Sequence, residues 1–259
     1  MAYQPNWVDL DGLVNIRDFG GMTTTGGRTL REGVLLRSDN LDDLPQTSIE
    51  WLLDDLMLSD VIDLRTNSER ARAQGFPFDG RVRVHKLSLY PEDDPNDPMP
   101  AWFGEFSVLE DGDPPDTVHV VAGHYLGYFR SRPDSIIGAL RAVAGSPGAA
   151  IINCAAGKDR TGTVSAVLLA ALGVPEDQIL ADYAASTERI VAILTKLGFM
   201  AGAGSGEHDA DVQSQSTPPE LMELVLRRVA RDFGSVAGWL DLNGWTADDQ
   251  AGLEAKLLG

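Results

Sequence analysis

The sequence is poor in cysteine: Cys154 is the only one among 259 residues, so an internal disulfide is excluded. A chain without disulfides is typical of a reducing compartment, and we expect a cytoplasmic protein, with export without a signal peptide as the alternative. The chain also lacks long apolar runs. The longest, 163–174, is shorter than the roughly 20 residues that a membrane-spanning helix requires.

Positive charge is scarce as well, with 21 basic against 39 acidic residues and a formal net charge of −18. An acidic surface repels the phosphate backbone of nucleic acids and anionic lipid headgroups. We therefore expect no nucleic-acid partner and no stable membrane binding. The 4 histidines show no metal-binding spacing, and a lone cysteine does not make a structural zinc site, so we expect no metal and no cofactor.

Short apolar runs alternate with helical patterns along the first part of the chain. Four runs predict strands, at 34–36, 61–64, 82–87 and 149–152. Three patterns predict helices, at 117–130, 134–144 and 161–172. Between the first two strands, Thr47 and Glu50 have the spacing of a capping box, which predicts one more helix. This alternation favours an α/β fold with a largely parallel sheet flanked by helices.

The chain after residue 175 has helical patterns throughout. Thr217 as an N-cap, followed by two prolines and Glu220, predicts one helix start, and Thr246 with Asp249 predicts another. Two segments predict long loops: an acidic, proline-rich one at 90–116 and a Gly/Ser/Asp-rich one at 200–216. We interpret the chain as a single domain, 1–259, with a core at about 1–175 and a C-terminal helical, lid-like sub-domain at about 176–259.

The most informative segment is 149–162, which predicts a strand, a loop of small residues and a helix start. Cys154 follows the strand, and Arg160 and Thr161 come six and seven residues later. Asp159 follows Gly157-Lys158 where a nucleotide-binding loop requires serine or threonine, so that motif is excluded. The alternative to a functional site is a buried structural cysteine beside an ordinary turn.

A loop of this composition is suited to bind a phosphate. Small residues let backbone N–H groups turn inward, and the helix that follows adds its unpaired N–H groups and the positive end of its dipole. Arg160 adds a bidentate donor for two phosphate oxygens. We expect a thiolate at Cys154 that attacks phosphorus and forms a cysteinyl-phosphate. The expected phosphate ligands are the loop residues Ala155, Ala156, Gly157, Lys158, Asp159, Arg160 and Thr161.

The run Cys-Ala-Ala-Gly-Lys-Asp-Arg-Thr-Gly at 154–162 resembles the protein tyrosine phosphatase superfamily, and within it the bacterial tyrosine phosphatase family 3. The run Asn-Ile-Arg-Asp-Phe-Gly-Gly at 15–21 is similar to a second family signature, and shorter blocks match at 36–38, 61–65, 233–235 and 239–240. The resemblance implies a phosphatase-type fold and metal-free, cysteine-dependent hydrolysis of phosphate monoesters. The implied substrate is a protein phosphotyrosine, with phosphoserine/threonine, a small phosphate monoester or a phosphoinositide as further possibilities.

The reaction needs a general acid for the leaving oxygen. The resemblance favours Asp159, and our second choice is Asp93 in the acidic loop. Thr161 can donate a hydrogen bond to the sulfur. The resemblance also implies that Lys158 suits a substrate with more than one phosphate, and that Glu69 and Arg72 support the site. The alternative for this pair is an exposed pair on one helix face.

One residue departs from the family pattern: Asn153 stands where the superfamily has histidine before the nucleophile. Asparagine carries no positive charge, so activity is expected to be lower. The alternative function is therefore a phospho-ligand-binding pseudophosphatase weakened by Asn153. Arsenate reductases share the Cys-x5-Arg spacing, but they need further cysteines that this chain lacks.

Overall fold

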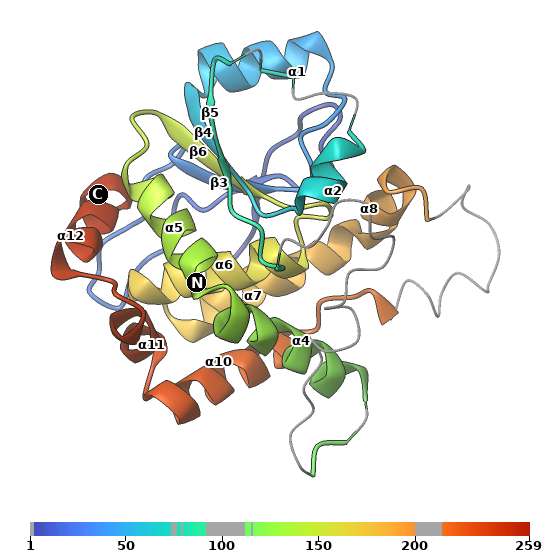
Figure 1. Ribbon diagram of the computed structural model, residues 1–259. Coiled ribbons are helices and arrows are strands. Elements are labelled where there is room, and N and C mark those ends of the chain that lie inside the picture. Colours follow the sequence, from blue (N-terminus) through green and yellow to red (C-terminus); the bar gives the residue numbers. More distant parts are fainter. Residues whose placement is uncertain (1–2, 74–76, 79, 92–111, 115, 200–213) are drawn as a thin grey trace.

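A six-stranded sheet lies at the centre of the molecule, with the strand order β1-β2-β3-β6-β4-β5 (Figure 1). The computed structural model describes residues 3–73, 77–78, 80–91, 112–114, 116–199 and 214–259. The strands are β1 Asn6–Trp7, β2 Arg17–Asp18, β3 Leu35–Ser38, β4 Leu58–Asp63, β5 Arg83–Lys86 and β6 Ala149–Asn153. Strands β3, β6, β4 and β5 are parallel, and β1 and β2 extend the sheet in antiparallel pairing. The predicted α/β fold with a largely parallel sheet is confirmed.

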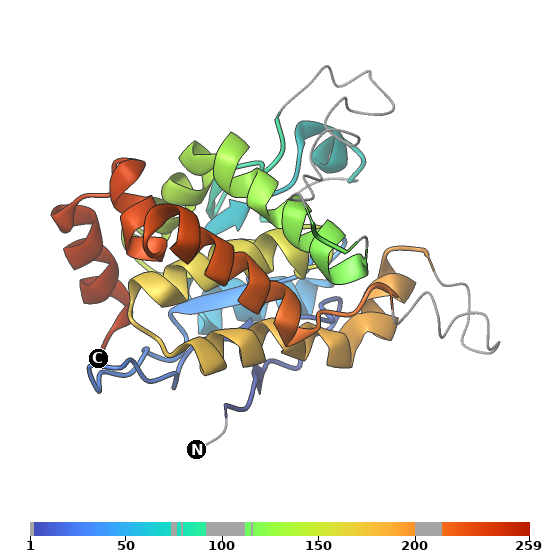
Figure 2. The ribbon, with the colours of Figure 1, turned by 90° about the horizontal axis from the view of Figure 1, so that it is seen from below.

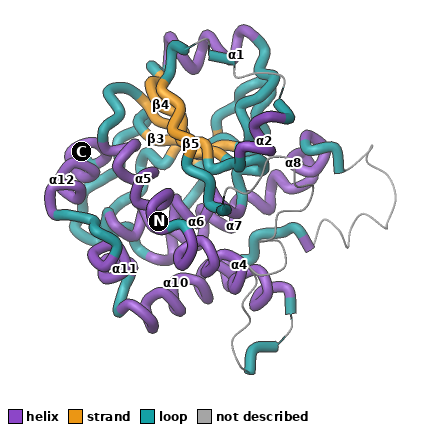
Figure 3. The backbone as a smooth tube through the Cα atoms, in the orientation of Figure 1, coloured by secondary structure: helices purple, strands orange, loops and turns teal. Residues whose placement is uncertain are grey.

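Both faces of the sheet are buried, so the central strands are nearly continuous apolar runs. On one face, Ile151 of β6 packs with apolar residues of α1 (Gln46–Glu50) and of the π-helix η1 (Trp51–Asp55). On the other face, Ile152 packs in a larger core with the long helices that follow β5. Figure 3 shows the strands between these two sets of helices.

The remaining helices belong mainly to the larger core and to the C-terminal part. They are α2 Asn67–Ala71, α4 Thr117–Ser131, α5 Pro133–Ala144, α6 Asp159–Ala171, α7 Glu176–Ala185, the 3-10 helix η2 Ser186–Arg189, α8 Ile190–Lys196, α10 Pro219–Phe233, α11 Val236–Leu242 and α12 Ala247–Leu257. Helix α10 packs against α4 and α7, and α12 packs against α5, as the view from below shows (Figure 2). The C-terminal helices thus share the larger core, and the division near residue 175 stays a prediction.

Helix starts were only partly predictable. The capping box of Thr246 and Asp249 at α12 is confirmed. The one proposed for Thr47 and Glu50 is wrong, because α1 already begins at Gln46 after Pro45, whose extended backbone makes it the N-cap. Thr217 is not an N-cap either: Pro218 takes that place. The hydroxyl of Thr217 instead hydrogen-bonds to Thr187, at 2.9 Å.

The two predicted loops fall mostly outside the described residues, which omit 92–111 and 200–213. Within the part that the structure describes, no helix combines the length and the apolar character needed to cross a membrane.

Candidate active site

The candidate phosphate-binding loop, residues 154–160, begins at the carboxyl end of the central strand β6. Asn153, the last residue of β6, pairs with Ser38 of β3 on one side and with Asp63 of β4 on the other. Parallel sheets of this type bind ligands at this edge, beyond the carboxyl ends of the strands. Cys154 follows directly and is only 1% exposed, so its thiol lies at the bottom of the site.

The outward-facing carbonyl groups of the loop are held by side chains from distant segments. Both the N–H and the side-chain amide of Asn40 donate to the carbonyl of Ala155, each at 3.1 Å. The amide of Asn15 donates to the carbonyls of Ala156 and Gly157, at 3.0 and 3.1 Å. These contacts fix the loop from its outer side.

The contacts that hold the loop carbonyls outward also orient the N–H groups of the loop inward. A trans peptide places its N–H opposite its carbonyl, so holding each carbonyl outward turns the next N–H inward. Within the described residues, the N–H groups of 155–160 donate to no other group. They form a concave set of donors next to Cys154, which fits an anion. Helix α6 continues the set, since it begins at Asp159 rather than at the predicted Thr161.

Gly157 is required at its position for two reasons. Its φ is +65°, in the left-handed region that favours glycine. A Cβ atom there would lie 2.5 Å from the backbone of Ser38 and of Asp39. The loop therefore rests directly on the end of β3, and only glycine permits this approach.

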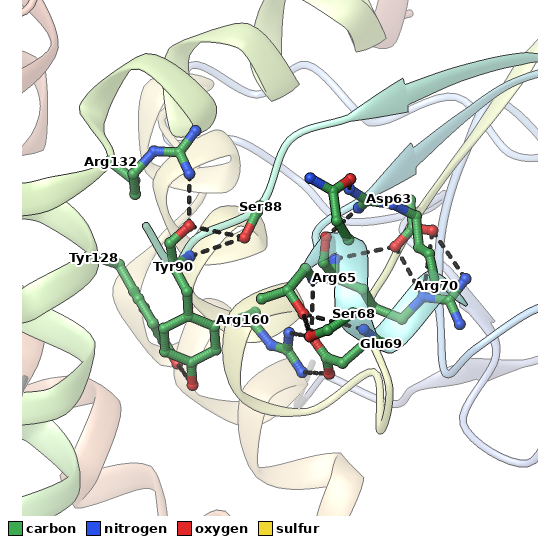
Figure 4. Close-up of polar contacts among 12 residues, drawn as sticks. Asp63, Arg65, Ser68, Glu69, Arg70, Ser88, Tyr90, Tyr128, Arg132 and Arg160 are labelled. Carbon is green, nitrogen blue, oxygen red and sulfur yellow. Dashed lines mark hydrogen bonds and ion pairs between the residues drawn. The ribbon is translucent and has the colours of Figure 1, made fainter. Parts of the chain in front are cut away.

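Arg160 projects from the first turn of α6 and forms a bidentate ion pair with Glu69 of α2 (Figure 4). Its two terminal nitrogens donate to the two carboxylate oxygens at 2.6 and 2.8 Å. Burial works against both charges, but the pairing dominates: the pKa of Glu69 falls to about 2, and the pKa of Arg160 rises above its ordinary value. The guanidinium also lies 5.2 Å from the centre of the Tyr90 ring, which forms the opposite wall.

Glu69 is held in place by its own helix. Thr66 caps α2 by accepting from the N–H of Glu69, and the Glu69 carboxylate accepts from the N–H of Thr66 at 2.8 Å. This capping box fixes the carboxylate where Arg160 meets it. The resemblance pointed to Glu69 as a supporting residue, and the structure places it on Arg160. Arg72, named with it, is exposed and lines a cleft with Glu69 and Ala155, but its side chain forms no hydrogen bond or ion pair with the other described residues.

Asp159 lies at the rim of the loop, with its side chain 35% exposed. The hydroxyl of Tyr125 donates to one of its carboxylate oxygens, and Tyr125 is linked to Tyr183 by a hydroxyl contact of 2.9 Å. Burial, together with the charge of Asp159, raises the pKa of Tyr125 well above its ordinary value, so this phenol stays a donor. The position suits a group that exchanges a proton with a bound substrate. Asp93, the second candidate acid, lies outside the described residues.

The side chain of Lys158 is held by Gln215 and lies 3.7 Å from the carboxylate of Asp159. It is 6% exposed, and its ammonium group donates to the backbone and side-chain oxygens of Gln215, at 2.7 and 3.1 Å. Lys158 and Asp159 line two clefts of about 400 and 470 Å³ beside the loop, the first of them bounded by apolar residues of α8. The lysine therefore belongs to the wall beside the loop.

Asn153, which directly precedes the nucleophile, and Thr161 of α6 are both fully buried. Neither the amide of Asn153 nor the hydroxyl of Thr161 has a hydrogen-bond partner among the described residues. Asn153 thus does not fix the loop through side-chain hydrogen bonds, a task left to Asn15, Asn40 and Arg37. In the described part of the chain, no three side chains of His, Cys, Asp or Glu meet in a way that could hold a metal ion.

Comparison with known proteins agrees with this geometry. Residues 8–259 match the model of the tyrosine phosphatase family. A protein of Cupriavidus necator with the provisional name tyrosine-protein phosphatase is 32% identical over 203 residues, covering 75% of this chain and 68% of that protein. The triple specificity protein phosphatase PtpB of Mycobacterium tuberculosis is 31% identical over 210 residues, covering 74% and 73% of the two chains.

The match spans nearly the whole chain and includes strands β2 to β6, the loop and the C-terminal helices. The protein is a phosphoric monoester hydrolase that acts on phosphorylated substrates, and the chain belongs to the tyrosine phosphatase family.

Proposed function

We propose that the protein hydrolyses protein phosphotyrosine through a cysteinyl-phosphate intermediate on Cys154. One observation carries the proposal: the loop that begins at the buried Cys154 has its carbonyls held by Asn15, Asn40 and Arg37, while the N–H groups of 155–160 donate to no other described residue. Arg160 completes this set of donors from the helix start. These donors match the oxygens of a phosphoryl group and the charge that develops on them.

The first step forms an S–P bond and breaks the P–O bond to the leaving group. The thiolate of Cys154 attacks phosphorus while the backbone N–H groups and Arg160 hold the three phosphoryl oxygens. Asp159 gives its proton to the leaving oxygen, which departs as an alcohol or phenol. Its partial exposure at the rim of the loop supports this role, and the hydrogen bond from Tyr125 holds its carboxyl group in place.

The second step returns the enzyme to its starting state. Asp159, now a carboxylate, takes a proton from a water molecule as the water oxygen attacks phosphorus. The S–P bond breaks, inorganic phosphate leaves, and Cys154 is again a thiolate. The buried hydroxyl of Thr161 has no other hydrogen-bond partner among the described residues, which supports a role in stabilising the departing sulfur.

The depth of the site favours an aryl phosphate. Cys154 is 1% exposed, and the aromatic ring of phosphotyrosine extends its phosphate farther from the peptide backbone than serine or threonine does. The Tyr90 ring beside Arg160 offers an apolar wall for such a ring. The name of the mycobacterial relative supports a broader range, so phosphoserine/threonine and phosphoinositide substrates belong to the same proposal.

The decisive experiment compares the wild type with Cys154→Ser on p-nitrophenyl phosphate in the presence of EDTA. We expect turnover by the wild type and none by the variant, because a serine hydroxyl is not ionised at neutral pH. Inorganic phosphate binding should survive, since the loop donors and Arg160 remain. Turnover by clean Cys154→Ser above a few per cent would contradict the covalent mechanism. Phosphate binding by a wild type without turnover would instead favour the pseudophosphatase.

A further inference from the structure

Two arginines face each other in the sheet behind the loop. Arg17 of β2 and Arg37 of β3 are direct partners in the antiparallel register, and both are 0% exposed. Like charges at such positions destabilise a sheet. Their burial is therefore expected to require a carboxylate.

Asp182 of α7 supplies that carboxylate to both arginines. Its two oxygens accept from Nε of Arg17 at 2.7 Å and from Nη1 of Arg37 at 2.5 Å. Burial opposes the ionisation of Asp182, but the two guanidinium groups keep its pKa below the ordinary value. We call these three residues the rear cluster. Arginine keeps its charge in proteins, so the rear cluster carries two positive charges and one negative charge, a net charge of +1.

Apart from Asp182, the described hydrogen-bond partners of the two arginines carry no charge. The hydroxyl of Tyr3 donates to Asp182 at 3.1 Å, and burial raises the pKa of Tyr3, which keeps it neutral. The ring of Trp7 lies 5.0 Å from the guanidinium of Arg17 and covers it from the N-terminal side. The remaining partners of Arg17 are the uncharged Asn15 and Ser186.

The rear cluster contacts the loop directly. Nη2 of Arg37 donates to the carbonyls of Gly157 and Lys158, at 2.7 and 3.3 Å. Arg17 donates to the side chain of Asn15 at 2.7 Å, and Asn15 in turn holds the carbonyls of Ala156 and Gly157. These are the same peptides whose N–H groups face the anion site.

We propose that the rear cluster is an electrostatic positioning device for the active site. Its unbalanced positive charge lies behind the loop and strengthens the binding of a phosphoryl group and the thiolate form of Cys154, while its hydrogen bonds hold the loop carbonyls outward. A buried charge is screened far less than a surface charge, so its influence extends through the loop. The inference rests on the proposed function of the loop.

Two variants change the charge in opposite directions. Arg17→Met makes the rear cluster neutral, leaves Arg37 paired with Asp182 and keeps the contact of Arg37 with Gly157. Asp182→Asn raises the charge to +2. We expect the dissociation constant of inorganic phosphate to rise roughly tenfold in Arg17→Met and to fall in Asp182→Asn. Arg81→Met is the matched control: it removes the same charge from an exposed pair with Asp54 and should leave phosphate binding unchanged.

A second measurement follows the thiolate itself. The pH at which iodoacetamide alkylates Cys154 at half its maximal rate should move up in Arg17→Met and down in Asp182→Asn. A purely structural role predicts weaker binding in both variants and no opposite shifts, and that result would overturn the proposal. The double variant restores the net charge of +1 and should return both quantities toward the wild type.

If Asp182→Asn does not fold, Arg17→Lys decides the question. Lysine keeps the charge but loses the planar donor geometry, so an electrostatic role predicts near-normal phosphate binding, and a structural role predicts the loss seen with methionine. Failure of the proposed function would look different. In that case the wild type would bind phosphate without hydrolysing p-nitrophenyl phosphate, and the opposite shifts in the two variants could still be measured.

Discussion

Arginines lie on two sides of the phosphate-binding loop, and carboxylates neutralise their charges to different extents. On the front, Arg160 meets one carboxylate, Glu69, in a one-to-one bidentate pair. At the rear, Arg17 and Arg37 share the single carboxylate of Asp182. The front pair is neutral and open to the substrate, whereas the rear cluster is positive and fully buried.

The difference indicates two separate tasks. In the proposed mechanism the front arginine, Arg160, binds the phosphoryl group, and its pair with Glu69 keeps the planar donor group oriented before a substrate binds. The rear arginines never contact a substrate, so their charge can stay unbalanced without attracting water or salt ions. In this proposal, Glu69 orients Arg160 at the front of the loop, and the rear cluster supplies a constant positive charge behind the loop.

The largest expected effect comes from a substitution of Arg160, the arginine at the front of the loop. Arg160→Lys keeps the charge but loses the two parallel hydrogen bonds to the phosphoryl group, which should cost about 3–4 kcal/mol in transition-state stabilisation. We expect kcat/KM to fall roughly a hundred- to a thousandfold. The matched rear variant, Arg37→Lys, should lose only about tenfold, because it weakens contacts to loop carbonyls and none to substrate. Equal losses in steady-state kinetics would contradict the distinction between front and rear.

The next effect concerns the stability of the front pair. The low pKa of Glu69, about 2 against an ordinary 4.5, means that its ionised form stabilises the fold. That contribution is complete above pH 4.5 and is lost as the pH falls toward 2. Glu69→Gln should therefore lower the free energy of unfolding by on the order of 3 kcal/mol at neutral pH.

Urea unfolding of wild type and Glu69→Gln between neutral and acidic pH measures this contribution. The difference between the two proteins should shrink as the pH approaches 2. A difference that stays constant across this range would mean that the ionised pair contributes nothing.

The smallest expected effect concerns the close contact between Gly157 of the loop and the end of β3. Gly157→Ala adds a methyl group at a positive φ and in contact with the backbone of β3, which should cost about 2 kcal/mol or more. Gly27→Ala is the control, because its φ is also positive, +81°, but its methyl group would meet nothing within 4 Å. That variant should lose only about 1 kcal/mol. Equal changes in the urea midpoint would show that the close approach to Ser38 is unimportant.

Much of the fold was predictable because the central strands are buried on both faces. The runs predicted at 34–36, 61–64, 82–87 and 149–152 overlap β3, β4, β5 and β6, although β5 lies at the edge of the sheet and its residues are half-buried or exposed. Strands β1 and β2, of two residues each, are too short to give a periodic pattern. Thr66 and Glu69 have the same sequence spacing as Thr47 and Glu50, but only Thr66 and Glu69 form a capping box. A sequence pattern does not reveal that Pro45, two residues before Thr47, is the N-cap of α1.

The site was predictable where its residues are neighbours in sequence. Cys154, the loop and Arg160 lie on one strand–loop–helix unit, so local spacing identifies them. The groups that hold the loop come from elsewhere: Asn15, Asn40 and Arg37 are more than a hundred residues away. The motif at 15–21 was noted only as a family likeness, and nothing local in it indicates that Arg17 reaches Asp182.

The contact between Arg17 and Asp182 joins residues 165 positions apart. A chain emerging from the ribosome therefore presents Cys154 and Arg160 before the carboxylate that balances the two buried arginines has been synthesised. Contacts of such long range form late, since closing a long loop costs entropy before any contact repays it. The two arginines should accordingly become buried behind the loop only once α7 has docked, so this part of the site is expected to assemble late in folding.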